Sequence, residues 1–572
     1  MTKAEFNSGV TSGTDTKSWW RDVLWLTFIL VVLFGFALGN RALWHPDEGR
    51  YVEIPREMAQ SGDYVTPRLD GVKYFEKPAL FYWLQAGVIK VFGLSEWAMR
   101  LWPATFGIAG CLLVYVTGRR LYDRRTGLLA CAVLATAPLY FMLARVITLD
   151  MPVSVLLTAA LFVFLLGTRE PPGSKRRNFF WAFYALAALA TLTKGLIGIV
   201  IPAVVIGVWI LLLWEWRLLK TIYLPSGLLL FFIIAAPWHV LAARANPEFA
   251  HFYFVHEHFE RYLSKVHGRY QPAWFFIPVL IAGFYPWIAF LPQAIGRALP
   301  ASWSARHQDK ESLFLLLWAG LVFAFFSFSD SKLIPYILPA MPPLALLLAR
   351  YLAEVWDQPA SSALRTGVWT LMVAGLVLAA ALVFFSDSTP DQPRVAEYTR
   401  VFGGYAYAII GGLLAVAFVP VILSWRRSSS LTMMSLTATS VVWLVILTLS
   451  LPMLDAKRTV KDLALTLKPR LQPTDEVLTY RTYYQDLPVY LERRITIVDW
   501  KGELKFGADV EDVSGWIIDE AAFWRRWQGP NWVYMLTERD NYDKLRTQGR
   551  GSFRLIAQSD TNVLVTNKEN QP

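Results

Sequence analysis

The sequence contains few charged residues. Asp, Glu, Lys and Arg make up 17% of the 572 residues, whereas a soluble globular domain carries about 25%. Hydrophobic residues make up 55%, and the mean hydropathy is +0.37. This composition excludes an ordinary soluble enzyme, and it excludes a disordered chain because disorder requires low hydrophobicity. A protein that crosses a membrane many times is the class that fits.

Cysteine is also scarce. The two cysteines, Cys111 and Cys131, both lie inside apolar segments, and we interpret them as small packing residues. They provide no disulfide framework and no CxxC motif for zinc or redox chemistry. The net charge of +11 does not indicate nucleic-acid binding, because the basic residues separate apolar runs instead of clustering on one soluble segment.

The apolar runs predict about thirteen membrane-spanning helices, of which the first is an uncleaved signal anchor. These runs cover residues 22–39, 99–117, 127–143, 152–167, 179–193, 196–213, 222–241, 273–293, 312–328, 333–349, 366–385, 403–424 and 431–450. Most Lys and Arg residues of the short loops fall on the side of the N-terminus, which the positive-inside rule makes cytoplasmic. The long loops 40–98 and 243–272 then face outward.

The tail differs in composition from the rest of the chain. Between 453 and 572 the apolar runs shorten to strand length, at 476–480, 495–500, 532–537, 553–558 and 562–567. Helix-like stretches at 461–471, 514–527 and 539–549 alternate with them. We therefore expect a transmembrane domain over 1–452 and a small soluble α/β domain over 453–572, on the outward side.

The first outward loop concentrates side chains that are capable of chemistry. Asp47 and Glu48 precede a predicted amphipathic helix, and Arg50, Tyr51 and Tyr74 share the loop. The alternative for the two acids is helix capping, which is worth about 1 kcal/mol. Because ionisable groups at a membrane surface are costly, we treat all five as candidates for catalysis or substrate binding.

Glu76 and Lys77 come just before Pro78, which predicts the start of a helix. Lys77 and the positive end of that helix suit a phosphate group, and a solvated Glu–Lys couple is the alternative. Asp150 follows the third apolar run and Lys194 lies at an outward turn. Helix capping by Asp150 and a snorkelling Lys194 are the alternatives there.

Further candidates lie in the second outward loop and before the tenth span. The planar guanidinium of Arg261 is a candidate to bind a phosphate. His256, together with Glu76, is a candidate ligand for a divalent ion. Surface histidines are the alternative to the metal. Lys332 and Tyr336 are four residues apart, so we expect them to share one helix face.

Every candidate falls on the outward side, whereas the cytoplasmic side has no GxxxxGK[ST] phosphate loop. An enzyme at the outer face cannot use ATP or nucleotide sugars from the cytoplasm. It requires an activated donor that is itself in the membrane, and a polyprenyl phosphate sugar fits this requirement.

The motifs resemble those of the bacterial lipid A aminoarabinosyltransferases, relatives of the protein O-mannosyltransferases in the GT-C class of membrane glycosyltransferases. The resemblance rests on WHPDEGRY (44–51), YFEKPALFYWL (74–84), RVITLDMPV (145–153), LTKG (192–195) and SKLIPYILPAMPPLALL (331–347). Leu333–Ile334 departs from the Arg–Pro expected in many relatives, while Lys332, Tyr336 and Pro339 keep their spacing.

The resemblance implies an inverting transfer of 4-amino-4-deoxy-L-arabinose from undecaprenyl phosphate to a lipid A phosphate, which gives resistance to polymyxin. It also implies a location in the bacterial inner membrane with a periplasmic site. The implied roles are catalysis for Asp47, Glu48 and Asp150, and binding of the carrier phosphate for Lys77, Lys194, Arg261, Lys332 and Tyr336. Arg50, Tyr51 and Tyr74 would line the substrate pocket, and no cofactor is required unless Glu76 and His256 hold a metal.

Two alternatives to this function stay open from the residues. A related transferase with another sugar or a protein acceptor would share the Asp–Glu loop. A flippase for a lipid-linked sugar is less favoured, because transporters place polar groups at the bilayer midplane and show inverted repeats, and this sequence shows neither.

Overall fold

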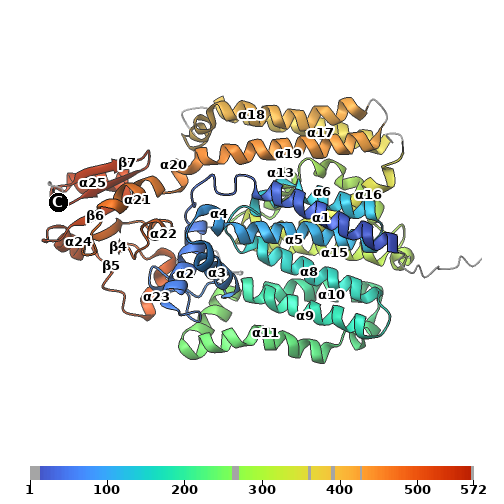
Figure 1. The fold of residues 1–572 in the computed structure, drawn as a ribbon, viewed down its shortest axis with the longest axis horizontal. Coiled ribbons are helices and arrows are strands. Elements are labelled where there is room, and N and C mark those ends of the chain that lie inside the picture. The colour runs from blue at the N-terminus through green and yellow to red at the C-terminus, as the bar shows by residue number, and fades with distance from the viewer. Residues whose placement is uncertain (1–12, 261–269, 359–361, 388–392, 425–427, 569–572) are drawn as a thin grey trace, which may run out of the picture.

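A bundle of helices carries a smaller α/β domain at one end (Figure 1). The structure is a computed structural model and describes residues 13–260, 270–358, 362–387, 393–424 and 428–568. The long helices of the bundle are α1 (Gly13–Gly35), α5 (Leu101–Leu121), α8 (Asp150–Arg169), α9 (Ser174–Lys194), α10 (Ile197–Leu213), α11 (Leu224–Ala245), α15 (Lys310–Phe328), α16 (Met341–Val355), α17 (Ser362–Asp387), α18 (Pro393–Ser424) and α19 (Ser429–Ser450).

Each predicted apolar run overlaps helical structure, but proline breaks several runs. The run at 127–143 divides into α6 (Arg124–Ala135) and α7 (Pro138–Leu143), and the run at 273–293 bends by 105° before α14 (Leu291–Ala298). Among the described residues, eight helices are long and apolar enough to cross a membrane, or nine if the bent pair counts as one span. The chain is therefore a multi-span membrane protein, while the number of thirteen spans stays a prediction.

The first long loop folds into its own small unit. It contains α2 (Asp47–Ser61), the short strands β1 (Arg68–Leu69) and β2 (Val72–Lys73), α3 (Leu80–Phe92) and α4 (Glu96–Met99). The helix predicted after Asp47 is thus confirmed. This helix is more deeply buried than the surface helix that we expected. Ten of its residues are buried, and the C-terminal domain covers it. The second loop contains the π-helix η2 (His251–Glu260).

The C-terminal domain contains a six-stranded sheet with the order β5-β4-β3-β6-β8-β7. The strands are β3 (Glu476–Tyr480), β4 (Thr496–Val498), β5 (Ile517–Ile518), β6 (Val533–Glu538), β7 (Arg554–Gln558) and β8 (Asn562–Thr566). All five predicted strands are confirmed. The first four strands of the order are parallel to one another, and β8 is antiparallel to both of its neighbours, β6 and β7.

Helices of the tail pack around this sheet. They are α20 (Asp455–Arg458), α21 (Lys461–Leu467), α22 (Leu487–Leu491), α23 (Lys505–Val510), α24 (Glu520–Trp527) and α25 (Arg539–Thr547). The helix predicted over 514–527 was too long at its start, because β5 occupies Ile517–Ile518 and Asp519 caps α24 by accepting the Ala522 N–H. The fold class, a helical membrane bundle with a C-terminal α/β domain, is confirmed.

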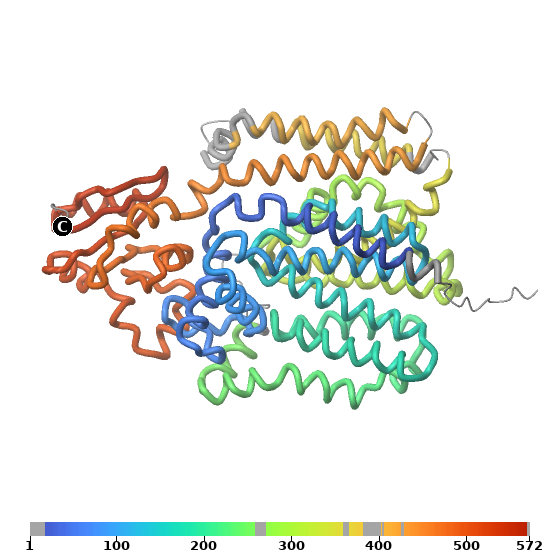
Figure 2. The backbone as a smooth tube through the Cα atoms, in the orientation of Figure 1, coloured from blue at the N-terminus to red at the C-terminus, as the bar shows by residue number. Residues whose placement is uncertain are grey.

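The C-terminal domain packs directly onto the first loop (Figure 2). At Gly49 in α2, a Cβ atom would lie 2.5 Å from backbone atoms of Gln485 and Asp486, so the two backbones touch where only glycine fits. The Asp70 carboxylate accepts the Ile495 N–H at 2.9 Å, and burial raises the pKa of Asp70 to about 8. The first loop and the tail therefore form one continuous structure above the bundle.

Candidate functional site

Asp47 presents an open carboxylate at the first residue of α2. Its side chain is 57% exposed, and its ion pair is with Arg50, whose Nη1 lies 3.3 Å from the Asp47 Oδ1. Pro46 occupies the N-cap position, and no side-chain cap bond forms there. The capping alternative is therefore not realised, and this carboxylate is available to a substrate.

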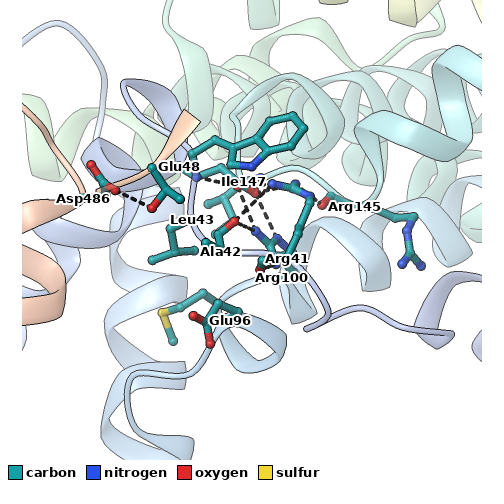
Figure 3. Close-up of polar contacts among 12 residues, drawn as sticks. Arg41, Ala42, Leu43, Glu48, Glu96, Arg100, Arg145, Ile147 and Asp486 are labelled. Carbon is teal, nitrogen blue, oxygen red and sulfur yellow. Dashed lines mark hydrogen bonds and ion pairs between the residues drawn. The ribbon is translucent and has the colours of Figure 1, made fainter. Parts of the chain in front are cut away.

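The carboxylate of Glu48, the next residue, is buried and fully paired. Its side chain is 1% exposed, and both Arg41 and Arg100 bind its carboxylate with two nitrogens each, at 2.5–3.0 Å. The backbone N–H groups of Trp44 and Ile147 donate to the same oxygens at 3.1 Å (Figure 3). No acceptor site on Glu48 is left for a substrate. The catalytic role predicted for Glu48 is therefore corrected to a structural one.

The charge of Glu48 is fixed by these partners. Burial opposes ionisation, but the charges of Arg100 and Arg41 outweigh it and hold the pKa of the Glu48 carboxyl well below its usual range. Arg100 also donates to the carbonyls of Leu38, Arg41 and Ala42. The cluster thus fastens the start of α2 to the top of the bundle and holds Asp47 in place.

Arg50 connects Asp47 to the C-terminal domain. Its Nη2 lies 2.6 Å from the Glu503 Oε2, and the Tyr74 hydroxyl donates to the same oxygen at 3.4 Å. The Arg50 guanidinium carbon lies 5.8 Å from the Tyr51 ring centroid and 6.0 Å from that of Tyr74. The structure thus brings together the predicted pocket residues Arg50, Tyr51 and Tyr74.

Sequence reasoning missed Glu503. It lies in a short turn of the C-terminal domain, 429 positions from Tyr74, and no motif surrounds it. Its other oxygen accepts the side-chain amide of Gln485 at 2.6 Å. Burial raises the pKa of Glu503, and the charge of Arg50 opposes that rise. The C-terminal domain therefore supplies one wall of the site.

A second group of predicted residues meets at the start of α8. Lys194, at the end of α9, forms an ion pair with Asp150, and its Nζ lies 4.9 Å from the Tyr336 ring centroid. Asp150 makes no side-chain cap bond at the start of α8. This group lies near the first, because Tyr51 and Leu149, the residue before Asp150, belong to the same buried hydrophobic cluster.

Lys332 does not lie where the sequence suggested. It precedes the 3₁₀ helix η6 (Ile334–Ala340), which contains Tyr336, so the two residues do not share a helix face. Pro335 and Pro339 prevent a regular α-helix from forming here. The Lys332 side chain is buried, and its Nζ donates to the backbone carbonyls of Gln271 and Ser329. Its role in this structure is to hold two loops together.

Lys77 lies against the second loop. Its Nζ lies 3.1 Å from the Glu257 Oε2 and donates to the Glu76 carbonyl at 2.7 Å. His256 stacks on Phe252, which in turn stacks on Phe506 of the C-terminal domain at 3.7 Å. Within the described residues, no three His, Cys, Asp or Glu side chains gather closely enough to hold a metal ion. Arg261 lies outside the described residues.

Comparisons with known proteins agree with this architecture. A family model for dolichyl-phosphate-mannose-protein mannosyltransferase matches residues 19–253, and one for the aminoarabinose transferase C-terminal domain matches residues 463–567. The undecaprenyl phosphate-alpha-4-amino-4-deoxy-L-arabinose arabinosyl transferase of Pectobacterium atrosepticum is 30% identical, over 91% of this chain and 94% of its own. The corresponding transferase 2 of Sodalis glossinidius is 31% identical, over 87% and 89%.

A solved structure shows the same fold. ArnT from Cupriavidus metallidurans bound to undecaprenyl phosphate is 28% identical, with a TM-score of 0.86 that covers 96% of this chain and 99% of that one. The fold, the open carboxylate at the bundle surface and these matches define a membrane-embedded glycosyltransferase. The chain belongs to the family of undecaprenyl phosphate-aminoarabinose arabinosyl transferases.

Proposed function

We propose that this protein transfers 4-amino-4-deoxy-L-arabinose from undecaprenyl phosphate to a phosphate of lipid A, and so gives resistance to cationic peptides such as polymyxin. The observation that carries this proposal is the exposed Asp47 carboxylate, held beside Arg50, Tyr51 and Tyr74 under the C-terminal domain. The relatives named for this transfer match nearly the whole chain.

Asp47 acts on the reacting sugar. Displacement of the carrier phosphate in one step inverts the anomeric carbon and passes through a cationic, oxocarbenium-like transition state. The Asp47 carboxylate stabilises that positive charge electrostatically. A phosphate acceptor is already an anion, so no general base is needed to deprotonate it. The ion pair of Asp150 with Lys194 supports a role for Asp150 in the same site.

The carrier phosphate leaves with negative charge, and cations offset it. Lys194 is the best placed, since it lies between Asp150 and Tyr336. Lys77 is a second candidate, and it would exchange its contact with Glu257 for the phosphate. Arg261 stays a candidate from the sequence, whereas the carbonyl contacts of Lys332 favour a structural role.

A resident metal is not required by this chemistry. Glu76 and His256 stay the candidate ligands for a divalent ion from the sequence. Elemental analysis of the purified protein and transfer in the presence of a chelator test this point directly. A stoichiometric metal that is lost in Glu76→Gln and His256→Ala variants would establish the site.

The proposal places the protein in the bacterial inner membrane with the site and the C-terminal domain in the periplasm. A reporter that is active only in the periplasm should be active when fused after Pro572. It should be silent after Arg125 or Arg177, which lie in the first turns of α6 and α9, on the side predicted to be cytoplasmic. A silent fusion after Pro572 would contradict the orientation, as would activity after Arg125.

A transfer assay with the purified protein tests the function. Undecaprenyl phosphate-linked aminoarabinose and lipid A should yield lipid A that is heavier by one aminoarabinose per modified phosphate. The same donor with an unfolded peptide should yield no product. Modification of the peptide in place of lipid A would refute the proposed acceptor.

Glu503→Gln should lower kcat about tenfold and should change KM by less. A tenfold loss is the low end of the effect of one charge-assisted hydrogen bond. Without the Glu503 charge, Arg50 is free to shift toward Asp47 and to neutralise it. Glu511→Gln is the matched control, because Glu511 pairs with Arg68 at 3.0 Å across the same junction. Equal losses in both variants would show that Glu503 only docks the domain.

A further inference from the structure

The segment that leads into α2 forms no regular helix or strand, yet its backbone N–H groups are all bound. Four consecutive residues, Ala42 to His45, donate in turn to the Asp455 carboxylate at 3.0 Å, the Tyr490 hydroxyl at 2.8 Å, the Glu48 carboxylate at 3.1 Å and the Arg458 carbonyl at 2.9 Å. Three of these four acceptors belong to the tail. The tail therefore shapes the few residues that come just before Asp47.

Asp455 binds this segment with both oxygens of its side chain. It is the first residue of α20, where the chain leaves α19 and the 3₁₀ helix η7 (Leu451–Leu454) and enters the C-terminal domain (Figure 1). Its Oδ1 accepts the Trp44 Nε1–H at 2.6 Å, and its Oδ2 accepts the Ala42 N–H at 3.0 Å. Helix capping does not explain this aspartate, because Leu454 holds the N-cap position and no side-chain cap bond forms there.

Trp44 connects Asp455 to Asp47. The Arg41 guanidinium carbon lies 4.3 Å from the centroid of the Trp44 ring, so the indole is held on its face by Arg41 and at its edge by Asp455. The Trp44 carbonyl accepts the Glu48 N–H at 3.0 Å and closes a turn that contains Asp47. The position of the indole therefore sets the position of this turn and of its exposed carboxylate.

We propose that Asp455 is a positioning residue for the Asp47 carboxylate and acts through Trp44. The inference rests on the proposed function, because the transfer reaction is its readout. The Glu48 cluster fixes the turn to the bundle, and Asp455 fixes it to the C-terminal domain. A misplacement of about 1 Å can lower the rate about 10²-fold, because charge stabilisation depends on the distance to the reacting atoms. Through Asp455 the C-terminal domain thus controls the chemical step without contact between this residue and the substrates.

Two variants of the full-length protein in detergent break this contact from either side. Asp455→Ala removes both acceptor oxygens, and Trp44→Phe removes the Nε1–H while it keeps an aromatic ring beside Arg41. Each should lower kcat about tenfold, the low end of the effect of one charge-assisted hydrogen bond, and should change the KM for donor and acceptor by less than about twofold. The double variant should be no slower than the slower single variant, because both substitutions remove the same interaction.

Glu511→Ala is the matched control. Glu511 is also a carboxylate of the tail that binds one side chain and one backbone N–H of the first loop, those of Arg68 at 3.0 Å and Lys73 at 2.8 Å. These two residues lie in β1 and β2 and not in the turn that carries Asp47. Glu511→Ala should lower the unfolding temperature to a similar extent as Asp455→Ala and should leave kcat unchanged.

Three results would overturn the inference. One is a kcat of Asp455→Ala close to that of the wild type, and another is an equal loss of kcat in Asp455→Ala and Glu511→Ala, which would leave Asp455 with a docking role only. The third is a double variant whose loss is the product of the two single losses, because Asp455 and Trp44 would then act independently. If Asp455→Ala does not fold, Trp44→Phe carries the same test. Absence of any transfer by the wild type would instead refute the proposed function.

Discussion

Asp47→Asn should reduce aminoarabinose transfer by about 10²–10³-fold, the effect expected when a group that stabilises transition-state charge is lost. The substitution keeps the size of the side chain and removes its negative charge. Stability should stay within about 0.5 kcal/mol of the wild type, because the carboxylate is exposed and pairs only with Arg50 among the described residues. The rate of product formation at saturating donor and acceptor measures the effect.

Asp540→Asn is the matched control for this prediction. Asp540 is an exposed aspartate of the C-terminal domain, in the first turn of α25. Its substitution should leave the transfer rate unchanged. A transfer rate of Asp47→Asn close to that of the wild type would remove Asp47 from the mechanism.

Glu48→Ala should destabilise the protein by about 3–5 kcal/mol, the usual effect of removing one partner from a buried ionic cluster. Arg41 and Arg100 would be left as two uncompensated cations in the same buried space. The unfolding temperature of the purified protein in detergent, followed by tryptophan fluorescence, measures this loss. Glu48→Gln should lose nearly as much, because the amide cannot neutralise two guanidinium groups.

The two neighbouring acids should therefore respond in opposite ways. Asp47→Asn loses activity and keeps stability, whereas Glu48→Ala loses stability and with it all activity. A Glu48→Ala protein that unfolds at the wild-type temperature but is inactive would restore Glu48 to the catalytic group. The stability of Arg100→Ala should fall as well, since Glu48 would then keep a single cationic partner.

Much of this fold follows from local patterns in the sequence. The strands of the C-terminal domain were predicted from short apolar runs between turn residues, and Glu476–Tyr480 matches its prediction residue for residue. Arg50, Tyr51 and Tyr74 lie together as expected from their crowding in one outward loop, and their role in a substrate pocket stays a prediction. Local composition carries this information, since burial at a membrane surface restricts which side chains occur there.

The separation of Asp47 from Glu48 could not be predicted in this way. The two residues are adjacent in the sequence and have the same charge. Successive residues on an α-helix point about 100° apart, so one faces the site and the other faces the bundle. Which acid faces which side depends on where Arg41 and Arg100 lie, and Arg100 is 52 positions away.

Contacts between the tail and the first loop could not be predicted from the sequence either. Glu503 reaches Arg50 only because the sheet of the C-terminal domain places its turn above α2. The prediction that Lys332 and Tyr336 share one helix face is wrong for a local reason. The prolines that follow Lys332 replace the expected α-helix with a 3₁₀ helix. Sequence patterns thus predict elements well, and long-range partners poorly.

The mass of lipid A from cells with and without this protein tests the central claim most directly. Cells that also make the undecaprenyl phosphate-linked donor should contain lipid A with added aminoarabinose when the wild-type protein is present. Cells with the Asp47→Asn protein, expressed at the same level, should contain only unmodified lipid A. Unmodified lipid A in cells with the wild-type protein, or modified lipid A in cells with Asp47→Asn, would contradict the account.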